Sequence, residues 1–219
     1  MEMNDMEKPD FLKNAMKNLG IPIITMDKYG FDCPGVDILF DYEKGGYMAT
    51  RHLIECGHRR IGCVAGKQSF HVTMQRLNGY KKALEESGIS YDPDLVYFGD
   101  YTMESGYEAF SYILGQKVTA IFSMNDEMAF GIYRAARLYG VSIPEDISIV
   151  GFNDISIAQY MSPPLTTVKI YTDFMGETTV SLLMERIRDG RKLSKKVILP
   201  TELVIRKSCI EKKLSQNNF

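Results

Sequence analysis

The sequence carries no surplus of positive charge. It has 26 Lys and Arg residues against 28 Asp and Glu residues, which gives a formal net charge of -2 at pH 7 over 219 residues. A domain that binds nucleic acid by itself usually carries excess Lys and Arg to neutralise phosphates. We therefore expect this chain not to bind DNA unaided.

Long apolar runs and cysteine motifs are also lacking. No stretch of about 18 apolar residues is present, so we expect no membrane-spanning helix. The N-terminal residues MEMNDMEKPD are acidic and lack the apolar core of a secretory signal. The four cysteines, Cys33, Cys56, Cys63 and Cys209, show no CxxC spacing. Together these features predict reduced thiols in a cytoplasmic protein.

Short apolar segments rich in β-branched residues alternate with amphipathic segments. Strands are predicted at Ile21–Met26, Val36–Phe40, Arg60–Ala65, Val96–Gly99, Thr119–Ser123, Ile147–Gly151, Thr166–Ile170 and Val197–Ile205, the last broken by Pro200. Helices are predicted at Pro9–Leu19, Glu127–Tyr139 and Tyr171–Arg188 and around Leu53, Tyr80 and Phe110. Left-handed helix caps are predicted at Gly57, Gly88, Gly115, Gly140 and Gly190. Apolar strands that alternate with helices predict an α/β fold, with a parallel sheet covered on both faces.

Polar and aromatic residues follow four of the predicted strands. These segments are Gly66–Phe70 with Arg76 beyond it, Asp100-Tyr101, Asn125-Asp126 and Asn153-Asp154. Ligands of open parallel sheets bind outside the carboxyl ends of the strands. Amides, carboxylates, a guanidinium and aromatic rings suit a small polar ligand. Asp126 and Asp154 can instead be helix N-caps, and Tyr101 can be a core residue.

Patterns for catalysis or metal binding are incomplete. The segment Gly62–Lys67 has three residues between its glycines where a phosphate-binding loop needs four, and Gln68 follows the lysine. The residues His52, Cys56, His58 and Cys63 match no standard zinc spacing. No GxSxG motif is present, and His71 has no evident partner. We expect neither an enzyme nor a bound metal or cofactor.

Several segments between Ile21 and Ser208 form a specific combination. They are His52-Leu53-Ile54 with Gly57–Ile61, Arg76–Tyr80, Thr119–Phe122 with Asn125, Asp126 and Ala129, Ile143–Phe152, Pro163–Val168 and Leu199–Ser208. In combination they resemble the effector-binding core of lactose-repressor-type (LacI-type) transcriptional regulators. The resemblance implies a type I periplasmic-binding-protein-like fold, in which two parallel-sheet lobes surround a ligand cleft.

The resemblance also implies how the chain divides. Residues 1–40 and 169–196 would form an N-lobe, residues 41–168 and 197–208 a C-lobe, and residues 209–219 a tail. The N-lobe is expected to be truncated, because the first strands and helices of the family's N-lobe and its DNA-reading helix-turn-helix have no counterpart here. Operator DNA would then be bound only through a region that this chain lacks.

Effector contacts are implied at Asp27, Arg76, Tyr101, Asn125 and Asn153, and Phe70 lies on the same predicted rim. The family usually has Asp at the position of Asn153, so the asparagine changes an acceptor into a mixed donor and acceptor. The effector is expected to be a sugar or a similar small molecule, whose binding closes the lobes and shifts the population of DNA-competent dimers. Replacing Arg76 by Ala is expected to weaken binding and leave stability nearly intact.

A homodimer is the expected assembly. The helix Glu127–Tyr139 has apolar residues on more than one face, which favours a second, intermolecular contact. Dimer contacts are predicted at Phe130, Arg134, Ile157 and Met161, and a fully buried helix is the alternative. Two further readings stay open: a periplasmic-type sugar-binding protein of a transport system, and an enzyme on a doubly wound sheet.

Overall fold

The structure, a computed structural model, describes residues 22, 24–26, 36–189 and 195–212. The chain forms two compact units, Met1–Asp41 with Tyr171–Pro200 (the first unit) and Tyr42–Ile170 with Thr201–Phe219 (the second unit). The lobe boundaries set out above stay a prediction. The helix predicted at Pro9–Leu19 and the candidate contact Asp27 lie outside the described residues.

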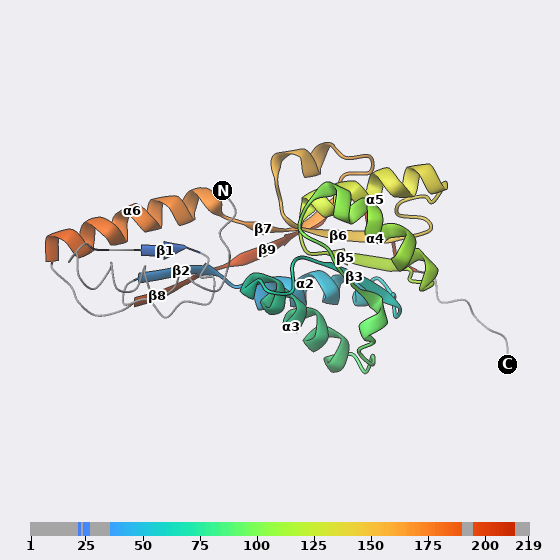
Figure 1. Ribbon diagram of the computed structural model, residues 1–219, viewed down its shortest axis with the longest axis horizontal. Helices are drawn as coiled ribbons and strands as arrows, with labels where there is room; N and C mark the ends of the chain where they lie inside the picture. The colour runs from blue at the N-terminus through green and yellow to red at the C-terminus, as the bar shows by residue number, and fades with distance from the viewer. Residues whose placement is uncertain (1–21, 23, 27–35, 190–194, 213–219) are drawn as a thin grey trace. The chain divides into compact units, whose positions relative to one another are not determined.

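Three described strands form the sheet of the first unit. They are β1 (Ile24–Met26), β2 (Val36–Phe40) and β8 (Lys195–Leu199), which are parallel and in the order β1-β2-β8. The helix α6 (Thr172–Asp189) packs on β1 and β2, with Met175 and Leu182 buried (Figure 1). This helix lies within one residue of the predicted segment at each end.

Six described strands form the sheet of the second unit. They are β3 (Ile61–Ala65), β4 (Val96–Phe98), β5 (Ala120–Ser123), β6 (Ser148–Asn153), β7 (Thr166–Ile170) and β9 (Thr201–Val204), in the order β4-β3-β5-β6-β7-β9. All neighbours are parallel except β7 and β9, which are antiparallel. The predicted break at Pro200 is confirmed, because β8 ends before this residue and β9 begins after it.

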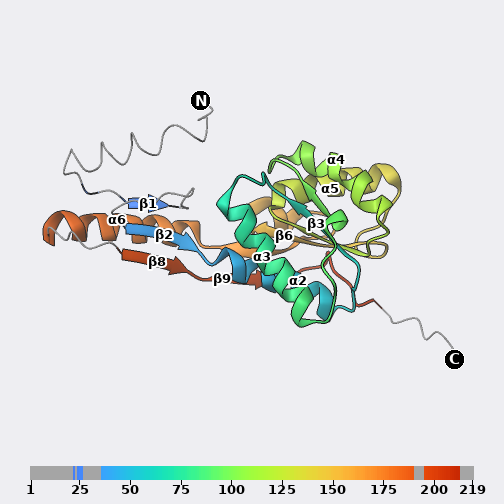
Figure 2. The ribbon, with the colours of Figure 1, turned by 60° about the horizontal axis from the view of Figure 1, so that its bottom comes forward.

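Two pairs of helices cover the two faces of this sheet (Figures 1 and 2). One pair is α2 (Tyr42–Glu55) and α3 (His71–Glu86), and the other is α4 (Met103–Gly115) and α5 (Asp126–Tyr139). Two short 3-10 helices, η1 (Pro93–Leu95) and η2 (Ser156–Tyr160), lie in connections. Both faces being covered, every residue of β3 and β5 is buried, as their apolar sequences predict.

Glycines allow each helix pair to approach closely. A Cβ atom at Gly79 of α3 would lie 2.0 Å from the backbone oxygen of Glu43 in α2. A Cβ atom at Gly131 of α5 would lie 1.9 Å from the backbone oxygen of Met103 in α4. Any larger residue at either position would push the helices apart.

The predicted left-handed caps are confirmed in part. Gly57, Gly88 and Gly140 have φ values of +87°, +66° and +67°. The prediction for Gly115 is wrong, because α4 includes this residue and the left-handed position falls on Lys117, with φ +55°. Gly190 lies outside the described residues.

Residues 209–212, the start of the predicted tail, belong to the second unit and are bonded to its β6 and to the end of α2. The Ile210 N–H donates to Ser148 Oγ at 3.2 Å, and the Lys212 N–H donates to the Cys56 oxygen at 2.7 Å. These hydrogen bonds hold the segment beside the amino ends of the strands, where β6 begins.

Candidate functional site

The strand order of the second unit creates a switch point between β3 and β5. From β3 the chain passes through α3 to β4 on one side, and from β5 it passes through α5 to β6 on the other side. Connections that diverge in this way leave a crevice outside the carboxyl ends of the two strands. The polar segments that follow β3, β4, β5 and β6 therefore meet at one edge, which we call the rim.

Arg76, in the second turn of α3, is the centre of the rim. Its side chain is only 5% exposed, and its Cζ atom lies 3.9 Å from the ring centre of Phe152 and 4.9 Å from that of Tyr42. The guanidinium donates to the backbone oxygen of Met124 and, at 3.4 Å, to Asn153 Oδ1. Aromatic faces and charge-assisted hydrogen bonds compensate a cation that has lost its water.

Tyr101 and Phe70 form an aromatic wall beside Arg76. Their ring centres are 6.2 Å apart and their planes differ by 21°, which is a stacked arrangement. The hydroxyl of Tyr101 shares a hydrogen bond of 2.7 Å with Thr73 Oγ1 in the first turn of α3. A Cβ atom at Gly66 would lie 2.0 Å from the Tyr101 ring, so the glycine makes room for it. The ring is therefore held by its neighbours at an orientation suited to stacking.

Asn125 is almost fully buried, with 3% exposed, and its amide is occupied by the protein. Its Oδ1 accepts the Met128 N–H at 2.9 Å as the N-cap of α5. Its Nδ2 donates to the Tyr101 oxygen at 2.8 Å and to Glu127 Oε2 at 3.1 Å. Because Tyr101 has a φ of +74°, a region that residues with a side chain rarely adopt, this bond helps to hold the backbone there.

Asn153 and Asp154 form the turn that ends β6. Their φ values are +114° and +55°. The Asn153 amide faces Arg76, whereas the Asp154 carboxylate forms an ion pair with Arg206 at 2.7 Å. Neither Asp126 nor Asp154 is an N-cap: Asn125 caps α5 and Ile155 precedes η2.

Of the six predicted effector contacts, five lie together in the second unit. Phe70 contacts Tyr101, Tyr101 contacts Asn125, and Arg76 joins Tyr101 to Asn153. Their role in ligand binding stays a prediction, as does that of Asp27, which lies outside the described residues. Sequence reasoning left out Tyr42 and Thr73, because their contacts with Arg76 and Tyr101 join segments that lie far apart in the sequence.

Asp126, expected either among the ligand-binding polar segments or as a helix N-cap, is fully buried, and both of its carboxylate oxygens accept hydrogen bonds. Its Oδ2 accepts the Ile155 N–H at 2.9 Å, and its Oδ1 accepts the Thr167 hydroxyl at 2.5 Å. Burial raises the pKa of Asp126 to about 6, while these two hydrogen bonds oppose the rise.

The predicted dimer residues differ in exposure. Ile157, on η2, is 55% exposed, and Arg134 is exposed on α5, where it pairs with Glu104 at 3.5 Å. Phe130 is only 7% exposed and Met161 is half-buried. The helix α5 is therefore not fully buried: it presents an exposed stripe that includes Arg134 and Leu138.

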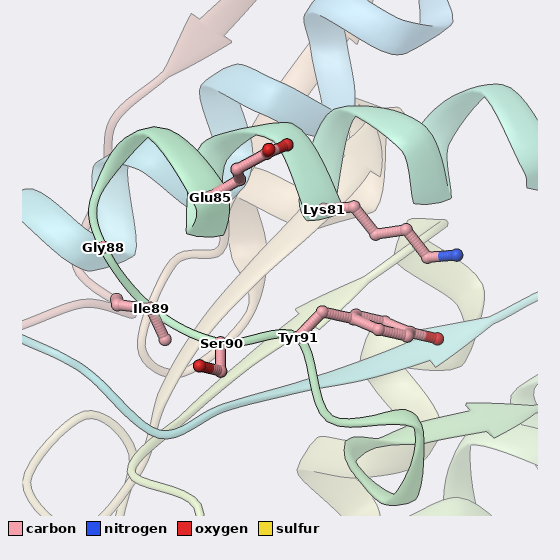
Figure 3. Close-up of a pocket in the computed structure, with 6 residues that line it drawn as sticks. All are labelled: Lys81, Glu85, Gly88, Ile89, Ser90 and Tyr91. Atoms are coloured by element: carbon pink, nitrogen blue, oxygen red, sulfur yellow. The ribbon is translucent and has the colours of Figure 1, made fainter.

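A separate hollow lies beside the end of α3 (Figure 3). Lys81 and Glu85 of α3 and the loop Gly88–Tyr91 line it, with Lys81 Nζ 4.4 Å from the Tyr91 ring centre. The neighbouring Tyr80 donates to the oxygen of Ile61, the first residue of β3. The hollow therefore lies near the amino ends of the strands, away from the rim.

The residues considered for a metal site have other surroundings. His58 is buried, with its ring nitrogens 2.9 Å from Thr119 Oγ1 and 3.0 Å from Ser148 Oγ, and burial lowers its pKa. Cys63 is buried within β3. Across the described ranges, no three His, Cys, Asp or Glu residues are grouped to hold a metal ion.

No helix among the described residues is long and apolar enough to cross a membrane.

Comparisons with known proteins agree with this fold. Residues 50–209 match the family described as periplasmic binding protein-like domain. The chain is 38% identical over 202 residues to the HTH-type transcriptional repressor PurR of Photobacterium profundum, covering 91% of this chain and 60% of that protein. This chain thus spans about three fifths of the length of that curated relative.

Two solved structures are similar as well. A LacI family transcriptional regulator from Enterococcus faecium with bound ribose has a TM-score of 0.86 and 31% identity, covering 93% of this chain and 76% of that one. A complex of the transcriptional regulator CelR with cellobiose has a TM-score of 0.84 and 35% identity, covering 91% and 62%. The relatives are named as regulators and not as enzymes, in agreement with the expectation from the sequence.

Proposed function

Because the chain belongs to the periplasmic-binding-protein-like family, as the effector-binding core of a LacI-type transcriptional regulator, we propose that it binds a sugar or similar small effector at the rim. The observation that carries the proposal is the arrangement around Arg76. Its guanidinium is buried against the rings of Phe152 and Tyr42 and donates to the Asn153 amide oxygen, at the switch point of the sheet. Solved relatives with bound ribose and cellobiose support the sugar class.

Each rim residue has a role in this proposal. Arg76 and Asn153 hydrogen bond to hydroxyl groups of the effector, and the Tyr101 and Phe70 rings stack against its apolar face. Asn125 holds the Tyr101 backbone with its NH2 group, so it can meet the effector only through the second lone pair of its Oδ1, and Asp27 completes the hydrogen bonds. Asn153 supplies a hydrogen-bond donor as well as an acceptor. The site can therefore bind an effector that has a carbonyl or ring nitrogen, as well as an effector that has hydroxyl groups only.

Effector binding then controls the regulator. We propose that binding closes the two lobes, and that the changed lobe orientation shifts the population of DNA-competent dimers. Dimer contacts come from Phe130, Arg134, Ile157 and Met161. Operator DNA is contacted by a separate region of the regulator, because this chain has a net charge of -2 and no excess of cations to neutralise phosphates.

A thermal-shift titration tests the binding proposal. The panel contains ribose, glucose, cellobiose, glucose 6-phosphate and hypoxanthine, so it separates sugars, sugar phosphates and purines. A ligand that binds only the folded state stabilises it by about 2.7 kcal/mol at a hundredfold excess over Kd. A dose-dependent rise in Tm for one class is the expected result, and it identifies the effector chemistry.

Two variants locate the response. Arg76→Ala abolishes the rise if the rim is the site. Lys81→Ala is the matched control, because it also removes a cation that lies over an aromatic ring, but in the hollow of Figure 3. A rise that survives in Arg76→Ala, or one that Lys81→Ala abolishes, would place the effector elsewhere.

A further inference from the structure

We propose that Asp126 is a positioning residue of the effector site, which holds the turn Asn153–Ile155 so that the Asn153 amide faces Arg76. The inference rests on the proposed function for its consequence in binding. Asp126 itself lies behind the rim, at the first position of α5, and is fully buried. It would therefore act through Asn153 and not by touching the effector.

The turn needs such support because of its backbone. Asn153 and Asp154 have φ values of +114° and +55°, a region that residues with side chains adopt at a cost. Such a backbone persists only where neighbouring groups hold it. Asp126 Oδ2 accepts the N–H of Ile155 at 2.9 Å, directly after the two residues, and Arg206 holds the Asp154 carboxylate at 2.7 Å.

The surroundings of the carboxylate show why a two-oxygen acceptor stands there. Oδ2 accepts a hydrogen bond from the Ile155 N–H, and Oδ1 accepts one from the hydroxyl of Thr167 in β7 at 2.5 Å. A Cβ atom at Gly151 of β6 would lie 2.3 Å from Oδ1, so only glycine leaves room for the carboxylate beside that strand. Asp126 thus joins the start of α5 to β7 and to the turn that follows β6.

Loss of the Asp126 carboxylate is expected to affect one part of the rim only. Asn153 Oδ1 accepts a hydrogen bond from the Arg76 guanidinium at 3.4 Å. If the turn changes its backbone conformation, Asn153 Oδ1 moves away from Arg76 and the site loses this acceptor. Tyr101 is held by Thr73 and Asn125, which do not depend on the turn. Loss of the Asp126 carboxylate is therefore expected to act on binding through Asn153 and to leave the aromatic wall in place.

The test compares Asp126→Ala with Asp126→Asn and a matched control, Ser208→Ala. In Asp126→Asn, the amide oxygen still accepts the Ile155 N–H. The NH2 group faces the Thr167 hydroxyl, which can accept a hydrogen bond from it. Ser208 is a suitable control because its buried hydroxyl also joins β6 to β7. It accepts the Thr166 N–H at 2.8 Å and donates to the Ile149 oxygen at 2.6 Å, away from the turn.

The first readout needs no ligand. Hydrogen exchange of the peptide that spans residues 153–157 is measured by mass spectrometry in the ligand-free protein. Asp126→Ala is expected to exchange faster there than both the wild type and Ser208→Ala, with Asp126→Asn in between. Equal exchange in Asp126→Ala and Ser208→Ala would overturn the proposal.

The second readout is the affinity for ribose and for cellobiose, measured by calorimetry. Asp126→Ala is expected to bind these sugars about tenfold more weakly than the wild type does. This is the size expected when one hydrogen bond to a charged group is lost, here the bond between Arg76 and Asn153. Ser208→Ala is expected to bind like the wild type at a temperature where both are folded. In an Asn153→Ala background the Asp126→Ala change should have no further effect, because its target is gone.

Several results would contradict the inference. They are unchanged affinity in Asp126→Ala, an equal loss in Ser208→Ala, and a full tenfold loss on top of Asn153→Ala. If Asp126→Ala does not fold, Asp126→Asn and Thr167→Val carry the test, with a smaller loss and the same dependence on Asn153. If neither sugar binds the wild type, the proposed function fails for these sugars, and hydrogen exchange alone decides the role of Asp126.

Discussion

Replacing Arg76 by alanine should affect both folding and binding, because this side chain is built into the protein. The change removes a guanidinium that is only 5% exposed and contacts the rings of Phe152 and Tyr42 at 3.9 and 4.9 Å. From the sequence alone a rim arginine is expected to be partly solvated, which predicts near wild-type stability. Its burial in the structure replaces that expectation.

The size of the effect follows from opposing contributions. A desolvated cation–π contact contributes up to about 2 kcal/mol. A hydrogen bond from a charged donor contributes about 1.5–3 kcal/mol. Removing the side chain also relieves the cost of burying its charge, which offsets part of both contributions. We expect a net loss of about 2 kcal/mol, or a fall in Tm of about 4–8 °C for a domain of this size.

The assay has two arms. Calorimetric unfolding of the ligand-free protein measures stability, and isothermal titration with the sugar that binds the wild type measures affinity at a temperature where both proteins are folded. We expect affinity to fall about a hundredfold, which corresponds to about 2.7 kcal/mol. A ligand-free Tm within 1 °C of wild type would refute the packing argument. Unchanged affinity in a folded variant would refute the placement of the effector.

Three further predictions concern other parts of the second unit. Gly66→Ala should displace the Tyr101 ring, which a Cβ atom would approach to 2.0 Å, and thereby weaken ribose or cellobiose binding in a titration; unaltered affinity would contradict this. His58 has a pKa below 6.5 when folded, so protonation favours the unfolded chain, and stability should fall as the pH drops from about 6.5 through the folded value. Between pH 7.5 and pH 5.5, the free energy of unfolding measured in urea should fall less in His58→Gln than in the wild type. An equal fall in both proteins would assign the pH dependence to other groups. Ile157→Asp, at a position 55% exposed, should shift a dimer towards monomer in sedimentation analysis while the protein stays folded, whereas an intact dimer would remove this residue from the interface.

The order of strands and helices could be predicted to a large extent from the sequence. Val36–Phe40 and Thr166–Ile170 form strands with the predicted bounds, and α6 differs from its predicted helix by one residue at each end. These segments could be found because their apolar pattern follows the local period of a strand or helix. The end of α4 was predicted wrongly, because a glycine at a helix end does not by itself determine where the left-handed residue falls.

The group of rim residues was also accessible from the sequence, but their individual environments were not. Residues that follow successive parallel strands must meet at one edge, so Arg76, Tyr101, Asn125 and Asn153 could be named together. The partners that define each of them lie far away in the sequence. Arg76 and Asn153 are 77 residues apart, and Asn125 and Tyr101 are 24 apart.

The sequence by itself thus determined the α/β class, the elements of the sheet and the family, because these depend on local periodicity and on contiguous motifs. Only the tertiary structure decided that Arg76 packs against aromatic rings, that Asn125 is a cap and that Asp126 accepts the N–H of Ile155. Burial and hydrogen-bond partners arise from segments brought together by the sheet order. A side chain's neighbours in space, and not its neighbours in sequence, determine its charge, its partners and its role.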